Sequence, residues 1–183
     1  MRKLSPEPGA QSMTFLSALL LTLFPAGVIV AALKDATSFT IPNWLSAAVA
    51  LAFFPAALLL HLPLAVLGAC LLMGVVALVC GMGMFAAGWC GGGDAKLLAA
   101  CALWMGWSAA PVFLMATGIS GGLLATGLIL ARKGVIGAYA SASPGWFGRL
   151  MSPDEDLPYG LAIAVGALAA FPSSPLVLSV GSL

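Results

Sequence analysis

A long segment without formal charge separates Asp35 from Asp94. From Ala36 to Gly93 the chain contains no Asp, Glu, Lys or Arg. One helical crossing of a bilayer takes about 20 residues, so a segment of this length holds two crossings and the turns around them. Two crossings return a chain to the side that it left. The sequence therefore predicts that Asp35 and Asp94 lie at the same face of a membrane.

The composition identifies the class of protein. Of 183 residues, 62% are hydrophobic and only 7% are charged, whereas a soluble domain carries about 25% charged residues. A chain with so few polar residues cannot cover a water-facing surface. This indicates an all-α, polytopic integral membrane protein whose partner is the lipid bilayer, with one membrane-embedded domain over residues 1–183. The net charge of +1 gives no indication of a nucleic-acid partner.

Apolar stretches separated by prolines, glycines and charges predict six helices. We expect them at residues 13–33, 44–60, 64–85, 94–110, 112–131 and 161–178, with breaks at 37–43, 60–63 and 106–111 and a polar connection at 134–157. Lys and Arg near helix ends mark the cytoplasmic side of a membrane protein. Five of them share the side of the two aspartates, against Arg2 and Lys3 on the other: Lys34, Lys96, Arg132, Lys133 and Arg149. The aspartates are thus predicted to face the cytoplasm.

Asp35 and Asp94 are the candidate catalytic residues. Two close carboxylates in a site of low dielectric do not both ionise easily and can share one proton. One can then act as a base on water while the other acts as an acid toward a carbonyl oxygen. The alternative is that both are boundary residues in headgroup water, with Asp94 serving as the N-cap of the helix at 94–110.

Three glycines precede Asp94, and they favour the functional interpretation. Gly91, Gly92 and Gly93 have no Cβ atoms, so a ligand or a neighbouring helix can approach the backbone closely; a flexible turn is the alternative. A phosphate-binding loop is excluded because Lys96 is followed by Leu97 rather than by Ser or Thr.

The remaining polar features give weaker indications. The four cysteines form no C-x-x-C pair, and we predict neither a metal site nor a cofactor. His61 is expected at the interface on the opposite face. Gly118 and Gly122 have G-x-x-x-G spacing, which predicts close helix packing either within the bundle or in a homodimer. The acidic run 154–156 is expected to be a solvated loop, the alternative being that it attracts a basic substrate segment.

Three segments together resemble a known family. Residues 91–97, Gly-Gly-Gly-Asp-Ala-Lys-Leu, resemble the GxGD-x-K motif of the type IV prepilin peptidases. Asp35 followed by Ile41-Pro42-Asn43 resembles the other catalytic segment of that family, and Pro158-Tyr159-Gly160 resembles its C-terminal end. The short chain is similar to the peptidases of Flp, or tight-adherence, pilus systems.

The resemblance implies a membrane aspartic endopeptidase. Such an enzyme removes the basic leader from prepilin-like or pseudopilin precursors at the cytoplasmic face of the bacterial inner membrane. It implies that Asp35 and Asp94 are the catalytic pair, and that the active-site loop and substrate-binding residues are Gly91, Gly93, Lys96, Pro42 and Asn43. Larger members also methylate their product and carry paired C-x-x-C zinc motifs, which are not found in this sequence. Two other hypotheses are a proton-coupled transporter with a carboxylate relay and a non-catalytic component of a secretion apparatus.

Overall fold

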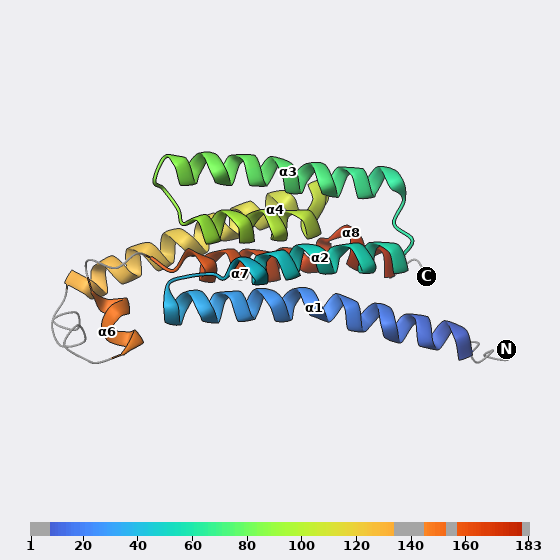
Figure 1. The fold of residues 1–183 in the computed structure, drawn as a ribbon, viewed down its shortest axis with the longest axis horizontal. Helices are drawn as coiled ribbons and strands as arrows, with labels where there is room; N and C mark the ends of the chain where they lie inside the picture. Colours follow the sequence, from blue (N-terminus) through green and yellow to red (C-terminus); the bar gives the residue numbers. More distant parts are fainter. Residues whose placement is uncertain (1–7, 134–144, 153–156, 181–183) are drawn as a thin grey trace.

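The structure is a helical bundle. This computed structural model describes residues 8–133, 145–152 and 157–180, and these contain helices and no strand. In chain order the elements are α1 (Pro8–Ser38), α2 (Asn43–Leu59), α3 (Leu64–Ala86), α4 (Gly92–Lys133), α6 (Trp146–Met151), α7 (Tyr159–Ala170), the 3-10 turn η1 (Phe171–Ser173) and α8 (Pro175–Val180) (Figure 1). The predicted all-α membrane fold is confirmed.

Four stretches of the described chain are long and apolar enough to cross a membrane. They are Leu19–Ser38, Leu64–Ala86, Gly92–Lys133 and Tyr159–Val180, while the apolar helix α2 is shorter, with 17 residues. Large apolar side chains cover the outside of the bundle, among them Leu58, Leu64 and Leu123, each at least 70% exposed. In water such a surface would drive association, whereas lipid tails accommodate it.

Helix α4 reverses direction at Gly106. A straight helix of its 42 residues would be about 63 Å long, roughly twice the hydrocarbon thickness of a bilayer. Gly106 instead has φ 54° and ψ −166°, and α4 doubles back there, as Figure 1 shows. Leu98 in the first arm (92–105) and Thr117 in the second arm (107–133) consequently line the same cavity. The two arms take the places of the fourth and fifth predicted helices, although Pro111, predicted to be in the turn, lies within the second arm.

The end of α1 beside Asp35 differs from the prediction. Helix α1 continues to Ser38, so Asp35 lies in its last turns rather than after its end. The hydroxyls of Thr37 and Ser38 bond back to the carbonyls of Leu33 and Lys34 and extend the helix. Phe39, at φ 54°, then ends it with its N–H bonded to the Asp35 carbonyl at 2.8 Å.

The predicted polar connection at 134–157 also contains structure. Its apolar segment Trp-Phe-Gly-Arg-Leu-Met forms the short helix α6 (Trp146–Met151), in which Met151 packs with Leu128 of α4. The acidic run Asp154-Glu155-Asp156 lies outside the described residues, so both interpretations of it stay predictions.

The buried indole of Trp104 joins four elements in the core. Its ring centroid lies 4.9 Å from that of Phe24 in α1, 5.8 Å from Phe53 in α2 and 6.3 Å from Phe171 in η1. Its Nε1–H donates to the Val49 carbonyl of α2 at 2.9 Å. The first arm of α4 is therefore held centrally, against α1, α2 and η1.

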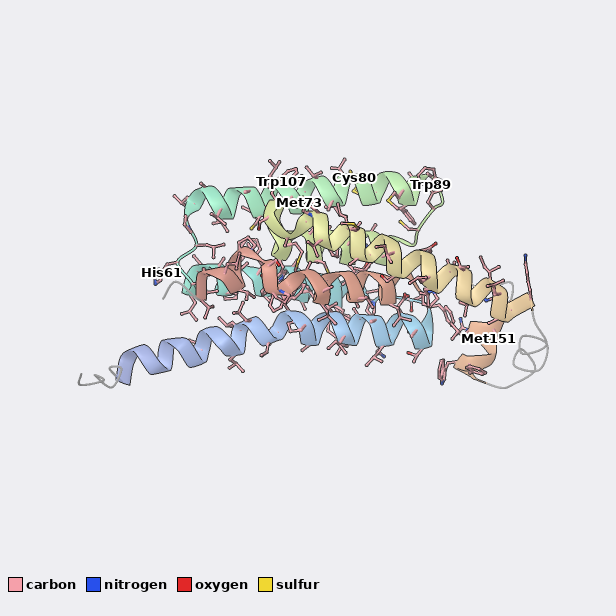
Figure 2. The ribbon with its side chains drawn as sticks, turned by 180° about the vertical axis from the view of Figure 1, so that it is seen from behind. His61, Met73, Cys80, Trp89, Trp107 and Met151 are labelled. Carbon is pink, nitrogen blue, oxygen red and sulfur yellow. The ribbon has the colours of Figure 1, made fainter. Side chains whose placement is uncertain are left out.

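The segments that carry the two aspartates lie at the same end of the bundle. The C-terminus of α1, the loop at 87–91, the start of α4 and α6 gather at the left in Figure 1, and the chain termini lie at the right. Figure 2 shows Trp89 of that loop and His61 at opposite ends of α3. Asp35 and Asp94 thus lie at one end of the bundle, and His61 lies at the other.

Candidate active site

Asp35 and Asp94 line a single cavity of about 480 Å³. Its walls come from the end of α1, the end of α3, the glycine-containing loop, the start of α4 and the segment entering α7. The lining residues are Asp35, Phe39, Phe85, Gly88, Trp89, Cys90, Gly91, Asp94, Leu157 and Tyr159. Two carboxylates that are 59 positions apart in the numbering are thus brought to one cavity by the hairpin of α2 and α3.

Asp35 is buried and is held by the N-terminus of α7. Its side chain is 5% exposed, and its Oδ2 accepts a hydrogen bond from the Gly160 N–H at 2.7 Å. The first amides of a helix have no partner within the helix, so this donor is free to bind a carboxylate. A Cβ at Gly160 would lie 2.8 Å from that same oxygen. Only a glycine therefore allows the backbone to approach Asp35 this closely.

Asp94 is partly buried and lies in the first turn of α4. The helix begins at Gly92, and the Ala95 N–H bonds to the Gly91 carbonyl at 3.1 Å, so the N-cap is Gly91. The prediction that Asp94 is the N-cap is wrong. Its Oδ2 instead accepts a hydrogen bond from the Gly91 N–H at 3.3 Å, as an acidic residue does in the third position of a capping box.

The arrangement allows acid–base chemistry on a carbonyl group. The two carboxylates come from different helices and face the same cavity, and each accepts a backbone N–H. A pair of this kind can hold one proton between them and divide the roles of acid and base. Among the described residues, no group of three or more His, Cys, Asp or Glu is placed to hold a metal ion.

Comparison with known proteins identifies the family. A model described as the type IV leader peptidase family matches residues 22–126, more than half of the chain. The chain belongs to the type IV leader peptidase family. The match includes both aspartates and the glycine loop, and the resemblance noted in the sequence is confirmed. No curated protein and no solved structure matches the chain significantly.

In this leader peptidase family member, the other predicted site residues lie in the cavity wall or beside it. Gly91 lines it, whereas Gly93, Lys96, Pro42 and Asn43 are not among the described lining residues. Lys96 and Asn43 line a separate groove between α2 and α3, on another face of the first arm of α4. Their predicted contact with substrate stays a prediction.

Gly93 and Lys96 connect the glycine loop to the Ile41-Pro42-Asn43 segment. A Cβ at Gly93 would lie 3.1 Å from the Ile41 Cβ and 3.2 Å from the Ile41 carbonyl oxygen. The Lys96 Nζ donates a hydrogen bond to the Asn43 Oδ1 at 2.7 Å. The glycine loop thus packs directly on the Ile-Pro-Asn segment, which explains why a small residue precedes Asp94.

Aromatic residues form a rim that the sequence did not predict. Phe39, Phe85, Trp89 and Tyr159 line the cavity of this family member, and the Arg149 guanidinium of α6 lies 5.0 Å from the centroid of the Phe39 ring. Most of them immediately flank the motifs, which is the signal that could have identified them. Gly160 lies outside the family match, and its bond to Asp35 is visible only in the folded chain.

Cys90 is the thiol at the cavity. Its Sγ lies 3.9 Å from the Gly81 carbonyl oxygen, to which it donates a weak hydrogen bond. Burial, and secondarily the negative charge of Asp94, raise the pKa of Cys90. The thiol is therefore neutral near pH 7 and does not resemble an activated nucleophile.

Within the part of the bundle that the structure describes, the G-x-x-x-G glycines Gly118 and Gly122 do not pack against another helix. A Cβ at Gly118 or Gly122 would meet no atom within 4 Å, whereas one at Gly121 would lie 3.4 Å from the Ala162 Cβ of α7. The expectation that Gly118 and Gly122 pack against a helix of the same bundle is wrong, because they lie on an exposed face of α4. The homodimer stays a prediction.

Proposed function

We propose that this chain is an aspartic endopeptidase that removes the basic leader from pilin-like precursors. The observation that carries the proposal is the common cavity of Asp35 and Asp94 in a chain that belongs to the leader peptidase family. A cavity between a buried and a partly buried carboxylate suits the general acid–base hydrolysis of a peptide.

In the proposed reaction, water lies between the two carboxylates. The ionised carboxylate takes a proton from the water while the water oxygen attacks the scissile carbonyl carbon. The protonated carboxyl donates its proton to the carbonyl oxygen, which forms a tetrahedral diol. When the diol collapses, one of its hydroxyls gives a proton to the ionised carboxylate and the C–N bond breaks. The leaving amine takes its proton from the other carboxyl group, which is protonated. The pair thereby regains its single shared proton.

The proposed substrate and membrane face follow from charge. Arg132, Lys133 and Arg149 belong to α4 and α6 at the cavity end of the bundle, and such an excess of basic residues is typical of the cytoplasmic side. We place the cavity at the cytoplasmic face of the bacterial inner membrane. In a precursor whose apolar segment lies in the bilayer, the junction between that segment and the basic leader would lie at the depth of the cavity. A role in an Flp-type system is part of the same proposal.

Replacement of each acid tests the proposal. Asp35→Asn and Asp94→Asn keep the shape of the side chain but remove the exchangeable carboxyl proton. Each is expected to reduce cleavage of a coexpressed precursor about 10²- to 10⁴-fold. The double variant is expected to lose no more than the single variants, because the two groups act as a unit. The readout is the ratio of precursor to mature pilin at equal levels of folded peptidase, and full processing by either single variant would refute the pair.

A further inference from the structure

The two carboxylates are carried by helices that are joined mainly through other helices. Asp35 belongs to α1, which packs chiefly on α2 and α7. Asp94 belongs to α4, which packs chiefly on α3, α7 and α2. The distance between the carboxylates therefore depends on how α2 and α7 are attached to both helices.

On the α7 side, the attachment to Asp35 is direct. The Gly160 N–H holds the Asp35 Oδ2 at 2.7 Å, and Gly121 and Gly166 allow α7 to pack closely on the second arm of α4. On the α2 side, the attachment is indirect. Asn43, the first residue of α2, follows Asp35 after the short turn that ends α1.

Two hydrogen bonds attach α2 to the first arm of α4. The deeper one joins Trp104 Nε1 to the Val49 carbonyl at 2.9 Å, and the outer one joins Lys96 Nζ to Asn43 Oδ1 at 2.7 Å. Asn43 lies about 9 Å along α2 from Val49, at 1.5 Å per residue. With the deep bond alone, the N-terminal end of α2 could pivot about Val49 and carry the end of α1 with it.

We propose that Lys96 is a positioning residue that fixes the separation of Asp35 and Asp94 through its bond to Asn43. Lys96 lies two residues after Asp94, and its ammonium group makes a charge-assisted hydrogen bond to Asn43 on the exposed side of the two helices. Gly93 against Ile41 supplies the matching backbone contact. Lys96 lines the groove beyond the cavity and so acts on the reaction through the helices rather than by contact with the scissile bond. This inference rests on the proposed peptidase function.

Lys96→Met and Asn43→Ala test the inference, since both remove the bond while largely preserving helix propensity. With purified protein in proteoliposomes and a leader-containing precursor, each is expected to lower kcat roughly 10- to 100-fold, the effect of a displacement of about 1 Å. KM is expected to stay unchanged. The double variant should lose no more than either single variant.

The pH profile separates positioning from a general structural effect. For unit charges about 4 Å apart at an effective dielectric constant of about 20, a further 1 Å weakens their coupling by roughly 0.6 pH unit. The two limbs of the bell-shaped profile should therefore draw together by about that amount in Asn43→Ala, which removes the bond without changing any charge. The other ionisable groups near the pair, Cys90, Tyr159 and Arg149, are unchanged in these variants.

Matched variants make each outcome decisive. Lys133→Met removes an exposed lysine elsewhere on α4 and should change neither kcat nor the pH profile. Wild-type kcat and pH profile in Asn43→Ala, or a change confined to KM, would overturn the positioning role. If Lys96→Met fails to fold, Asn43→Ala carries the test. Failure of the peptidase function itself would appear separately, as a wild-type protein that does not cleave the precursor.

Discussion

The contact between Gly160 and Asp35 gives a sharp prediction for Gly160→Ala. The new Cβ would lie 2.8 Å from the Asp35 Oδ2, 2.9 Å from its Cβ and 3.0 Å from its Cγ. Carbon atoms in contact are about 3.5–4.0 Å apart, so Asp35 would have to retreat by roughly 0.5–1 Å. Asp35 is only 5% exposed, and the retreat would displace its neighbours as well.

Gly160→Ala should lower activity more than it lowers stability. Overpacking costs about 1–3 kcal/mol of stability, and the better helix propensity of alanine returns up to about 1 kcal/mol. A net loss of about 1–2 kcal/mol leaves most molecules folded if stability is within the usual range of roughly 5–15 kcal/mol. Activity should fall further, by about 10²-fold, because a catalytic group is displaced by up to about 1 Å.

The assay for Gly160→Ala compares cleavage of a coexpressed precursor with thermal unfolding of the purified protein in detergent. Gly68→Ala in α3 is the matched control, since a Cβ there meets nothing within 4 Å, and it should leave cleavage unchanged. Wild-type cleavage by Gly160→Ala would refute the reasoning, as would a loss of activity no larger than the loss of folded protein.

Three further predictions concern the cavity and the core. A water-soluble methanethiosulfonate reagent should label Cys90 and block cleavage, and the Cys90→Ser variant should be protected. Burial and the charge of Asp94 raise the pKa of Cys90. Labelling should therefore become faster as the pH rises, and it should be faster in Asp94→Asn than in the wild type. Trp104→Phe leaves the Val49 carbonyl without its indole donor and should destabilise the protein by about 1–3 kcal/mol, measured by unfolding in detergent; unchanged stability would contradict the role of Trp104. Gly106→Ala forces a side chain into φ 54° with its Cβ 2.9 Å from the Cys70 Sγ, and should lower the unfolding midpoint relative to Gly68→Ala.

Much of the fold follows from hydropathy alone. The predicted helix at 64–85 agrees with α3 (Leu64–Ala86) to within one residue, and the hinge at 60–63 lies between α2 and α3 as expected. These boundaries are set locally, by proline, by glycine and by the change from apolar to polar residues. The ends of α1 and α4 were predicted less well, because side-chain bonds from Thr37 and Ser38 and the bond from the Gly91 N–H to Asp94 extend the helices past the charges.

The sequence by itself determined that the chain is an all-α membrane protein of the leader peptidase family with two acids at one end, because an uncharged segment of two crossings has to return. Only the tertiary structure decided how those acids are held. The Gly160 amide reaches Asp35 across 125 residues, and Lys96 reaches Asn43 across 53. Contacts at such separations leave no periodic signal in the sequence, since they depend on the sharp reversal at Gly106 and on helices that pack closely through glycine.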